Sequence, residues 1–544
     1  MNEMTNIKQD RKQTFTGHEA LILEEKLIFE IGSANKSGVD LEPVPEVSNR
    51  LGDCMAPAQP DLPGLSEPEA LRHFIRLSQK NYSIDAGLYP LGSCTMKHNP
   101  RLNEKMARLP GFSDIHPLQP VSTVQGALAL MDELAHWLKT LTNMPAVALS
   151  PKAGAHGELC GMMAIRAAIE ARGELETRRR VLVPESAHGT NPATAALLGF
   201  KVDEIPANGD GRVDLVAFKD KLGDDVAAIM LTNPNTCGLF ERDIIEIADA
   251  LHEAGGYFYC DGANFNAIVG RVRPGDLGID AMHINLHKTF CIPHGGGGPG
   301  MGPIACKRHL QVYLPNHPVI KDCGPTSGIG AVSAAPWGSS SILSISWMYI
   351  KMMGSTGLKL ATQVAILNAN YIAHRLKDHF PILYKGSNGN VAHECIIDIR
   401  KIKSETGITE EDIAKRLIDY GFHAPTMSWP VAGTMMIEPT ESESLTEIDR
   451  FCETLIKIKK EIDKIKSGEF DKVDNPIKNA PHTDLELSSD EWKHKYSREE
   501  AAYPSKYLKT NKFWPPVARV DNVYGDKNIF CTCPSIDEFK EDAA

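Results

Sequence analysis

The stretch AAIMLTNPNTCGLFERDIIEIADALHEAGGYFYCDGANFNA, residues 227–267, decides the fold class of this chain. It opens with an apolar run over 227–232. A helical pattern follows over 241–256 and ends on the glycines expected at a helix C-terminus. A second apolar run occupies 256–261. Because apolar runs that alternate with helices are typical of parallel strands joined by crossover helices, the stretch predicts a strand–helix–strand unit of an α/β core.

The same alternation continues on both sides of this stretch, from about residue 145 to about residue 310. Further strands are expected over 146–150, 180–184 and 282–287. A further helix is expected over 157–174, where apolar residues recur every three or four positions. The chain therefore contains one large α/β domain built around a parallel sheet.

We expect five segments along the 544 residues. An extended N-terminal arm covers 1–125, because its sequence is rich in Pro, Gly and isolated polar residues. It would wrap a neighbouring subunit, cover an active site or form a plain surface extension. The large domain covers 126–340, a connecting helical region 341–376 and a smaller α/β domain 377–466. A C-terminal extension, 467–544, has Tyr and Trp content that argues against a free tail.

The smaller domain is predicted from two short apolar runs and two amphipathic patterns. Strands are expected over 393–400 and 435–440, and helices over 410–421 and 444–463.

Composition excludes several classes of function. Lys and Arg total 58 against 70 Asp and Glu, and the resulting net charge of −12 disfavours nucleic acid and anionic lipid as partners. No run approaches the roughly 20 apolar residues that span a bilayer, and the N-terminus lacks a signal peptide, so we expect a cytoplasmic protein. The 12 cysteines are too sparsely spaced for a secreted scaffold. Cys531 and Cys533 are the only close pair, which gives a metal site little support.

The strongest local signal is NLHKTF, residues 285–290, where Lys288 follows a predicted apolar strand. Lysine amines form Schiff bases with aldehydes, although a lysine in such a position can also lie in a surface turn. Asp261 ends another predicted strand and would lie at the same edge of the sheet, where ligands of open α/β sheets bind. A pyridoxal phosphate enzyme needs a carboxylate against its ring nitrogen, because the protonated ring is the electron sink. Asp261 suits that role, and Ala263 is small enough to pack against one face of the ring.

Three further strand ends carry polar or small residues. The loop SPKAGAHGE, 150–158, would present backbone N–H groups and a helix N-terminus to a phosphate, although any loop between a strand and a helix needs small residues. The run GGGGPG, 295–300, is equally open to a phosphate cradle or a mobile loop. His188 could stack on the second face of the ring or be a structural histidine, and Thr232 could donate a hydrogen bond to the cofactor.

These motifs together resemble a known family, the glycine cleavage system P-protein, also called glycine dehydrogenase (decarboxylating). The similarity extends from about residue 80 to residue 534 and includes AGAHGE, SAHGTNPATA, LTNPNTCGLFE, DGANFNAIVG, NLHKTFCIPHGGGGPG, LGSCTMKHNP, IHPLQP, IEPTESE and WPPVARVDNVYGDKN. The resemblance implies the pyridoxal-phosphate fold type I, like that of aspartate aminotransferase, with a smaller C-terminal α/β domain.

The resemblance also implies roles for individual residues. Lys288 would hold pyridoxal 5'-phosphate covalently, Asp261 would face the pyridine nitrogen and His188 would stack on the ring, and these three are the expected catalytic residues. The other expected cofactor-binding residues are Ala263, Gly154, Ala155, His156, Thr232, His287 and Thr289.

The implied reaction is decarboxylation of glycine, with transfer of the aminomethyl group to the lipoyl arm of the H-protein. The chain resembles subunit 2 of the two-chain form, which would pair with subunit 1 in two copies of each. Its C-terminal region from about residue 480 instead resembles the end of the long single-chain form. Two alternatives remain: a pyridoxal enzyme for small amino acids that needs no lipoyl partner, and a non-catalytic regulatory subunit.

Overall fold

The structure is a computed structural model that describes residues 25–33, 36–39, 41–42, 45, 48, 50, 52–54, 62–294 and 300–528. These residues form two compact units. The first contains the described residues up to Tyr82, together with Ile418–Gly421 and those from Phe470 onward. The second contains Ser83–Leu417 and Phe422–Glu469. The expected arm, 1–125, is therefore divided between the units, and the expected large domain lies in the second together with all of the expected small domain except 418–421.

The second unit is built on a seven-stranded sheet with the strand order β1-β7-β6-β5-β4-β2-β3. All neighbouring strands are parallel except at β7, which runs antiparallel to both β1 and β6. The strands are β1 (Ala146–Ala148), β2 (Arg180–Pro184), β3 (Lys201–Ile205), β4 (Val226–Thr232), β5 (Tyr257–Asp261), β6 (Ala281–His283) and β7 (Ile304–Cys306).

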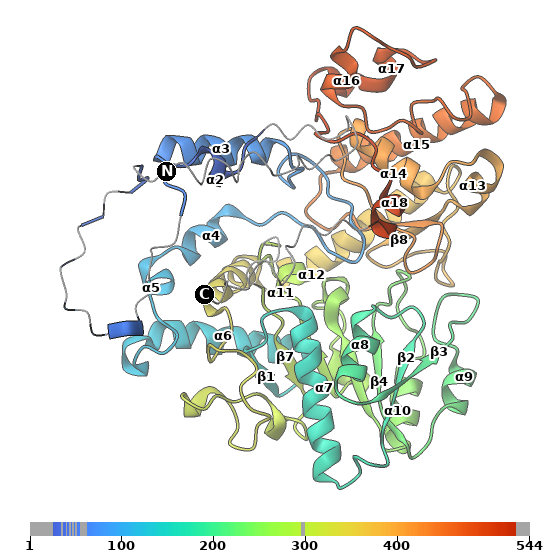
Figure 1. Cartoon of the computed structure of the whole chain (residues 1–544). Coiled ribbons are helices and arrows are strands. Elements are labelled where there is room, and N and C mark those ends of the chain that lie inside the picture. Colours follow the sequence, from blue (N-terminus) through green and yellow to red (C-terminus); the bar gives the residue numbers. More distant parts are fainter. Residues whose placement is uncertain are drawn as a thin grey trace, which may run out of the picture. The chain divides into compact units, whose positions relative to one another are not determined.

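Helices cover both faces of this sheet, and alternate residues of the central strands point to opposite faces. On one face, Ile229 of β4 packs in a cluster with residues of α6, α10 and α12. On the other face, Met230 packs in a second cluster with residues of α7 and α8. Figure 1 shows α7 lying along the sheet. The helices of this domain are α4 (Arg101–Ala107), α5 (Pro110–Ser113), α6 (Gln125–Thr142), α7 (Gly154–Ala171), α8 (Thr190–Leu197), α9 (Leu215–Asp220), α10 (Ile244–Glu253) and α11 (Leu286–Thr289).

The smaller α/β domain follows α12 (Leu343–Leu376), which bends where Gly354 adopts a φ of 59°. Its three-stranded antiparallel sheet has the order β8-β10-β9. The elements are β8 (Cys395–Asp398), β9 (Thr426–Met427), β10 (Thr434–Ile437), α13 (Arg400–Thr406), α14 (Glu410–Asp419) and α15 (Leu445–Ser467).

The first unit contains α2 (Ile28–Ile31), α3 (Glu67–Gln79), α16 (Asp484–Ser488), α17 (Arg498–Ala502) and α18 (Asn522–Lys527). A buried polar network orders part of the C-terminal extension. The ring of His482 lies 2.8 Å from the Asp419 carboxylate and 2.8 Å from the Tyr496 hydroxyl. Among the described helices of the whole chain, none is both long and apolar enough to cross a membrane.

Most strands occur where the sequence predicts them, and the exceptions have local causes. The expected strand over 282–287 is shorter, because β6 ends at His283 and the helical turn α11 follows. Lys288 therefore lies on a helical turn after the strand. The sequence pattern predicts no strand at β3, β7 or β9. The edge strand β3 reads KVDEI, with three charged residues, while β7 and β9 have only three and two residues.

Candidate active site

A pocket of about 210 Å³ lies at the carboxyl ends of β4, β5 and β6, where the first turn of α7 and the turn α11 also meet. Its walls bring together most of the residues predicted from the sequence, which are Gly154, Ala155, His188, Thr232, Asp261, Ala263, His287 and Lys288. The topology explains this meeting, because parallel strands end at one edge of the sheet. Residue Asp261 ends β5 and is the register partner of Thr232, which ends β4.

The Asp261 carboxylate is buried and held from three sides. It accepts hydrogen bonds from the Ala263 backbone N–H at 2.9 Å and from the Asn191 side-chain amide at 3.1 Å. The Nε2 atom of His283 lies 3.4 Å from Oδ1. Burial alone would raise the pKa of this carboxyl, but the nearby groups, His283 foremost, outweigh burial and hold the pKa below its ordinary value. Asp261 is therefore an ionised, immobile acceptor aimed into the pocket.

Lys288 enters the pocket from α11. Its Nζ donates a hydrogen bond to the backbone carbonyl of Ser93, at 2.6 Å. Ser93 also lines the pocket, although it belongs to the Pro- and Gly-rich segment that precedes the sheet. The backbone of Ser93 has a φ of 64°, a conformation that costs free energy for a residue other than glycine. The segment around Ser93 thus forms one wall of the site, which agrees with the expectation that this region covers an active site.

His188 lies in the loop between β2 and α8. Its side chain is exposed, and its Nδ1 lies 2.9 Å from the Thr190 hydroxyl. The ring meets that of Trp429 edge-on, with centroids 5.8 Å apart. One ring face of His188 can therefore remain available to a planar ligand in the pocket.

Close packing explains the small residues at the start of α7. A Cβ on Gly154 would stand 2.2 Å from Oδ1 of Asn285, and one on Gly157 would stand 2.2 Å from the Gly302 carbonyl. The helix N-terminus can approach the pocket only because these positions lack side chains. Unpaired N–H groups and the helix dipole at such an end favour an anion.

Two predicted residues do not line the pocket. His156 is half-buried, and its Nδ1 accepts a hydrogen bond from the Lys152 backbone N–H at 3.1 Å. Thr289 is buried one residue beyond Lys288, and its carbonyl accepts a hydrogen bond from Lys97 at 2.7 Å. Residues 295–299 of the glycine-rich run, as well as Cys531 and Cys533, lie outside the described residues.

Sequence reasoning missed Glu158, which lies one helical turn after Gly154. Glu158 is buried and accepts hydrogen bonds from the Thr190 hydroxyl at 3.0 Å and the Asn191 amide at 2.9 Å. Burial, reinforced by the charge of Asp261, raises the pKa of this carboxyl to about 7. A residue four positions into a helix shares a face with the first residue, so the spacing from Gly154 could have indicated Glu158.

Seven other pocket residues were also missed, namely Ser93, Ala153, Thr190, Thr236, Asn264, His283 and Asn285. Of these, His283 was hidden within an apolar strand pattern. Burial lowers the pKa of its ring, and the nearby charge of Asp261 opposes that shift.

The pocket is lined by polar atoms that lack partners. Among the described residues, five buried side-chain atoms around it make no hydrogen bond: Glu158 Oε1, Thr232 Oγ1, Asn264 Oδ1, Asn285 Oδ1 and His287 Nδ1. Burial lowers the pKa of His287 to about 3, so its ring is neutral. Unpaired buried polar atoms are costly and rare, at about 1–3 kcal/mol each. With the carboxylate of Asp261, the amine of Lys288 and the helix N-terminus, they fit a planar, phosphorylated aldehyde such as pyridoxal phosphate.

Comparison with known proteins first defines the class. The sequence profile described as "Aminotransferase class-V" matches residues 160–318. A crystal structure of glycine decarboxylase (P-protein) of the glycine cleavage system, in inhibitor-bound form, superposes with a TM-score of 0.62 at 21% identity, covering 75% of this chain and 93% of that one. The chain has the fold type I of pyridoxal-phosphate enzymes, with a smaller C-terminal α/β domain, as the sequence predicted.

Sequence relatives are more specific. Glycine dehydrogenase (decarboxylating) of Pelagibacter ubique is 63% identical over 483 residues, and that of Teredinibacter turnerae 52% over 478 residues. These matches cover 88% and 87% of this chain and 50% of each relative. The profile described as "Glycine dehydrogenase, C-terminal domain" matches residues 361–482. The chain is homologous to the glycine dehydrogenase (decarboxylating) family, which confirms the resemblance, and it spans about half the length of the curated relatives it matches.

Proposed function

We propose that this chain decarboxylates glycine and passes the aminomethyl group to the lipoyl arm of an H-protein, using pyridoxal 5'-phosphate held covalently at Lys288. One observation carries the proposal: Lys288 and the ionised Asp261 line one pocket whose other walls hold five unpartnered polar atoms. Enzymes of this fold act on many substrates, and we choose glycine because the sequence is similar to that of glycine dehydrogenase (decarboxylating).

Each wall of the pocket has a task in this reaction. When bound, the cofactor would supply an electron sink for the pair that stays on the α-carbon when carbon dioxide leaves. The Asp261 carboxylate holds a proton at the pyridine nitrogen, and its neighbours Asn191 and His283 keep it oriented. His188 and Ala263 would hold the ring from its two faces, and the α7 N-terminus at Gly154 and Ala155 would receive the phosphate.

The unpartnered atoms would position the cofactor's remaining groups. The hydroxyl of Thr232 and the neutral ring of His287 offer hydrogen bonds to oxygen atoms of the bound group. We assign His156 and Thr289 supporting roles. The Thr289 carbonyl fixes the position of α11 through its hydrogen bond with Lys97, and Lys97 pairs in turn with Glu441 at 2.6 Å.

We also propose partners. The curated relatives have about twice the matched length, which supports a requirement for the remaining half, equivalent to P-protein subunit 1. Two copies of each half would assemble, and lipoylated H-protein would be the third component. Without the lipoyl carrier, the aminomethyl group has no acceptor. The need for a lipoyl carrier distinguishes the proposed enzyme from other pyridoxal-phosphate decarboxylases and from aminotransferases.

The test measures labelled carbon dioxide released from carboxyl-labelled glycine. The full chain is assayed alone, then with subunit 1, then with subunit 1 and lipoylated H-protein. We expect rapid release only in the complete mixture, and none when Lys288→Ala replaces the native chain. Full activity of the isolated chain would overturn the proposed partners. Binding of pyridoxal phosphate without any release of carbon dioxide in the complete mixture would overturn the proposed reaction.

A further inference from the structure

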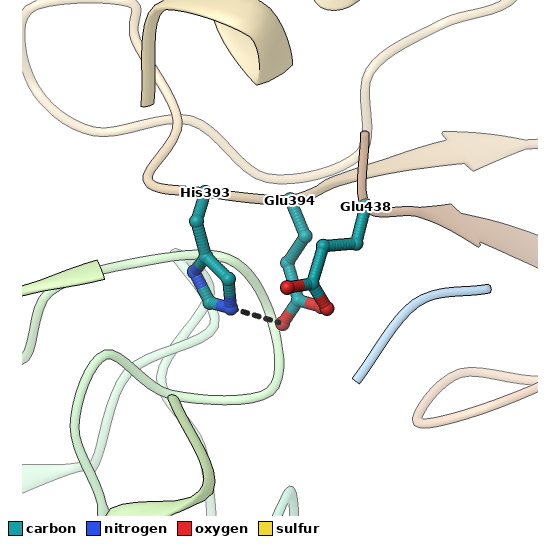
Figure 2. A group of neighbouring side chains, drawn as sticks. All are labelled: His393, Glu394 and Glu438. Atoms are coloured by element: carbon teal, nitrogen blue, oxygen red, sulfur yellow. Dashed lines mark ion pairs between the residues drawn. The ribbon is translucent and has the colours of Figure 1, made fainter. Parts of the chain in front are cut away.

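A buried cluster of three side chains lies in the smaller domain, outside the walls of the candidate active site. Glu394 directly precedes β8, and Glu438 directly follows β10. The antiparallel register pairs Cys395 with Ile437, so the two glutamates face each other across the strands. His393 is the neighbour of Glu394, and Figure 2 shows its ring turned toward the Glu394 carboxylate. All three side chains have 0% exposure.

The hydrogen bonds of this cluster are incomplete. Glu438 is well satisfied, because it accepts from the backbone N–H and hydroxyl of Thr95 at 3.1 and 2.6 Å and from Asn266 at 3.2 Å. Glu394 accepts from the Ser93 backbone N–H at 3.0 Å through one oxygen only. Its other oxygen, Oε1, and both ring nitrogens of His393 make no hydrogen bond with any described residue.

Two facing carboxylates in a protein core cannot both be ionised without a counter-charge. Burial, followed by the charge of Glu438, raises the pKa of Glu394 well above its ordinary range. A proton shared by the two glutamates would remove the repulsion but would leave both nitrogens of His393 without a hydrogen bond, since Nε2 lies 3.9 Å from Oε1 of Glu394. The positive charge of Lys288 lowers the pKa values of Glu394 and His393. Its amine, however, donates its hydrogen bond to the Ser93 carbonyl and not to the cluster. A cation bound between the three side chains would supply the counter-charge and would give Glu394 Oε1 and one ring nitrogen of His393 a partner.

We propose that His393, Glu394 and Glu438 bind one divalent transition-metal ion such as Zn²⁺. Their three ligand atoms, one from each residue, lie within 4.8 Å of one another. One imidazole and two carboxylates are a ligand set suited to Zn²⁺, and two carboxylates balance its charge. Zn²⁺ ligands stand about 2.0–2.2 Å from the ion, so small side-chain rotations would close the site. Water would complete the coordination.

The position of this site gives the ion a structural task. Through Glu394 and Glu438 it would fix the segment from Ser93 to Thr95, whose residues Ser93 and Thr95 have φ values of 64° and 45°. The Ser93 carbonyl in turn receives the amine of Lys288. The ion would therefore stabilise a wall of the active site without touching the reacting groups.

The proposal is tested by metal uptake of the full chain, a readout that does not depend on its activity. Protein stripped with a chelator is dialysed against Zn²⁺, and the bound metal is counted by elemental analysis with and without the variants His393→Ala and Glu394→Gln. We expect the native chain to bind one ion more than either variant, and each variant to lose at least about 100-fold in affinity, since even groups behind the ligands contribute 10–100-fold. Zn²⁺ should also raise the Tm of the native chain but not that of His393→Ala.

The chain offers a matched control for adventitious binding. His494 lies 2.7 Å from Asp474 and 3.2 Å from Glu486, so it also combines one imidazole with two carboxylates, but it is partly exposed and its bonds are complete. His494→Ala should bind as much Zn²⁺ as the native chain. If His393→Ala fails to fold, anomalous scattering at the zinc edge from crystals of the native chain should place an ion between His393, Glu394 and Glu438. Equal uptake by the native chain and both cluster variants, or no density between the three residues, would overturn the site.

Discussion

The amine of Lys288 lies 2.6 Å from the carbonyl oxygen of Ser93, although 195 positions separate the two residues along the chain. The segment before the sheet is thus part of the site that the sheet creates. Leu91 forms an isolated antiparallel bridge with Ile437 of β10, and the N–H of Ser93 is held by Glu394. These contacts keep Ser93 in a left-handed conformation that few side chains tolerate.

Substitutions at Ser93 should test this strained position. Ser93→Gly keeps the carbonyl and the N–H while relieving the conformational cost, so it should leave the free energy of unfolding unchanged or slightly higher. Ser93→Val should lower that free energy by about 1–2 kcal/mol or more, because a β-branched residue disfavours positive φ. Denaturant unfolding of both variants is the measurement. Equal stability of the two would show that the left-handed conformation is not imposed on Ser93.

Gly154→Ala should disrupt the phosphate side of the pocket. The added methyl group would stand 2.2 Å from Oδ1 of Asn285, so α7 or Asn285 must move. We expect at least about a tenfold loss of affinity for pyridoxal phosphate, corresponding to roughly 1.4 kcal/mol, measured by absorbance titration. Gly126→Ala is the matched control, because a Cβ there meets nothing within 4 Å. Unchanged affinity in Gly154→Ala would contradict the placement of the phosphate.

Asp261→Asn should reduce turnover far more than cofactor binding. The amide has the shape of the carboxylate but cannot keep a proton on the ring nitrogen, so a loss of about 100-fold or more in kcat is expected. The phosphate and stacking contacts remain, and pyridoxal phosphate should stay bound. Steady-state rates and cofactor content are measured on the same preparation. A variant with full cofactor and native kcat would mean that another group faces the nitrogen.

Glu158 should make the stability of the cofactor-free chain depend on pH. Its pKa is raised from 4.5 to about 7 in the folded state, so between these values the folded chain binds more protons than the unfolded chain. The free energy of unfolding contributed by this group is therefore highest below about pH 4.5 and falls as the pH rises through 7, by up to about 3 kcal/mol.

Glu158→Gln cannot ionise and should lose that part of the dependence. Unfolding is compared at pH 5 and pH 8 for the native chain, for Glu158→Gln and for the exposed control Glu185→Gln. The free energy of unfolding should differ less between pH 5 and pH 8 in Glu158→Gln than in the native chain, and Glu185→Gln should behave like the native chain. An undiminished difference would show that Glu158 titrates normally in the folded chain.

The sequence predicted the parts of the fold and site that depend on local patterns. Continuous apolar runs identify β4 and β5 because both strands are buried on two faces. Asp261 could be found because it ends such a run, and Lys288 because it directly follows the strand predicted over 282–287. The turn α11 was missed because its capping bond, from the Thr289 N–H to the Asn285 carbonyl, leaves no mark in hydrophobic periodicity.

Contacts between distant residues could not be predicted in this way. Ser93 meets Lys288, and Glu394 meets Glu438, only through the tertiary arrangement of the sheets and of the segment that precedes them. Glu158 shares a helix face with Gly154, but its raised pKa comes from burial and from the charge of Asp261, which the sequence does not show. Pairing at strand ends sets these contacts, and it depends on topology more than on composition.

The central claim is that Lys288 is the residue that binds the cofactor. Reduction of the full chain with borohydride in the presence of pyridoxal phosphate, followed by peptide mass mapping, tests it most directly. The account predicts a stable phosphopyridoxyl group on the peptide that contains Lys288, and its loss in Lys288→Ala, while Lys97→Arg keeps the label because that lysine is paired with Glu441. A label found mainly on any other lysine, or retained at native yield in Lys288→Ala, would contradict the account.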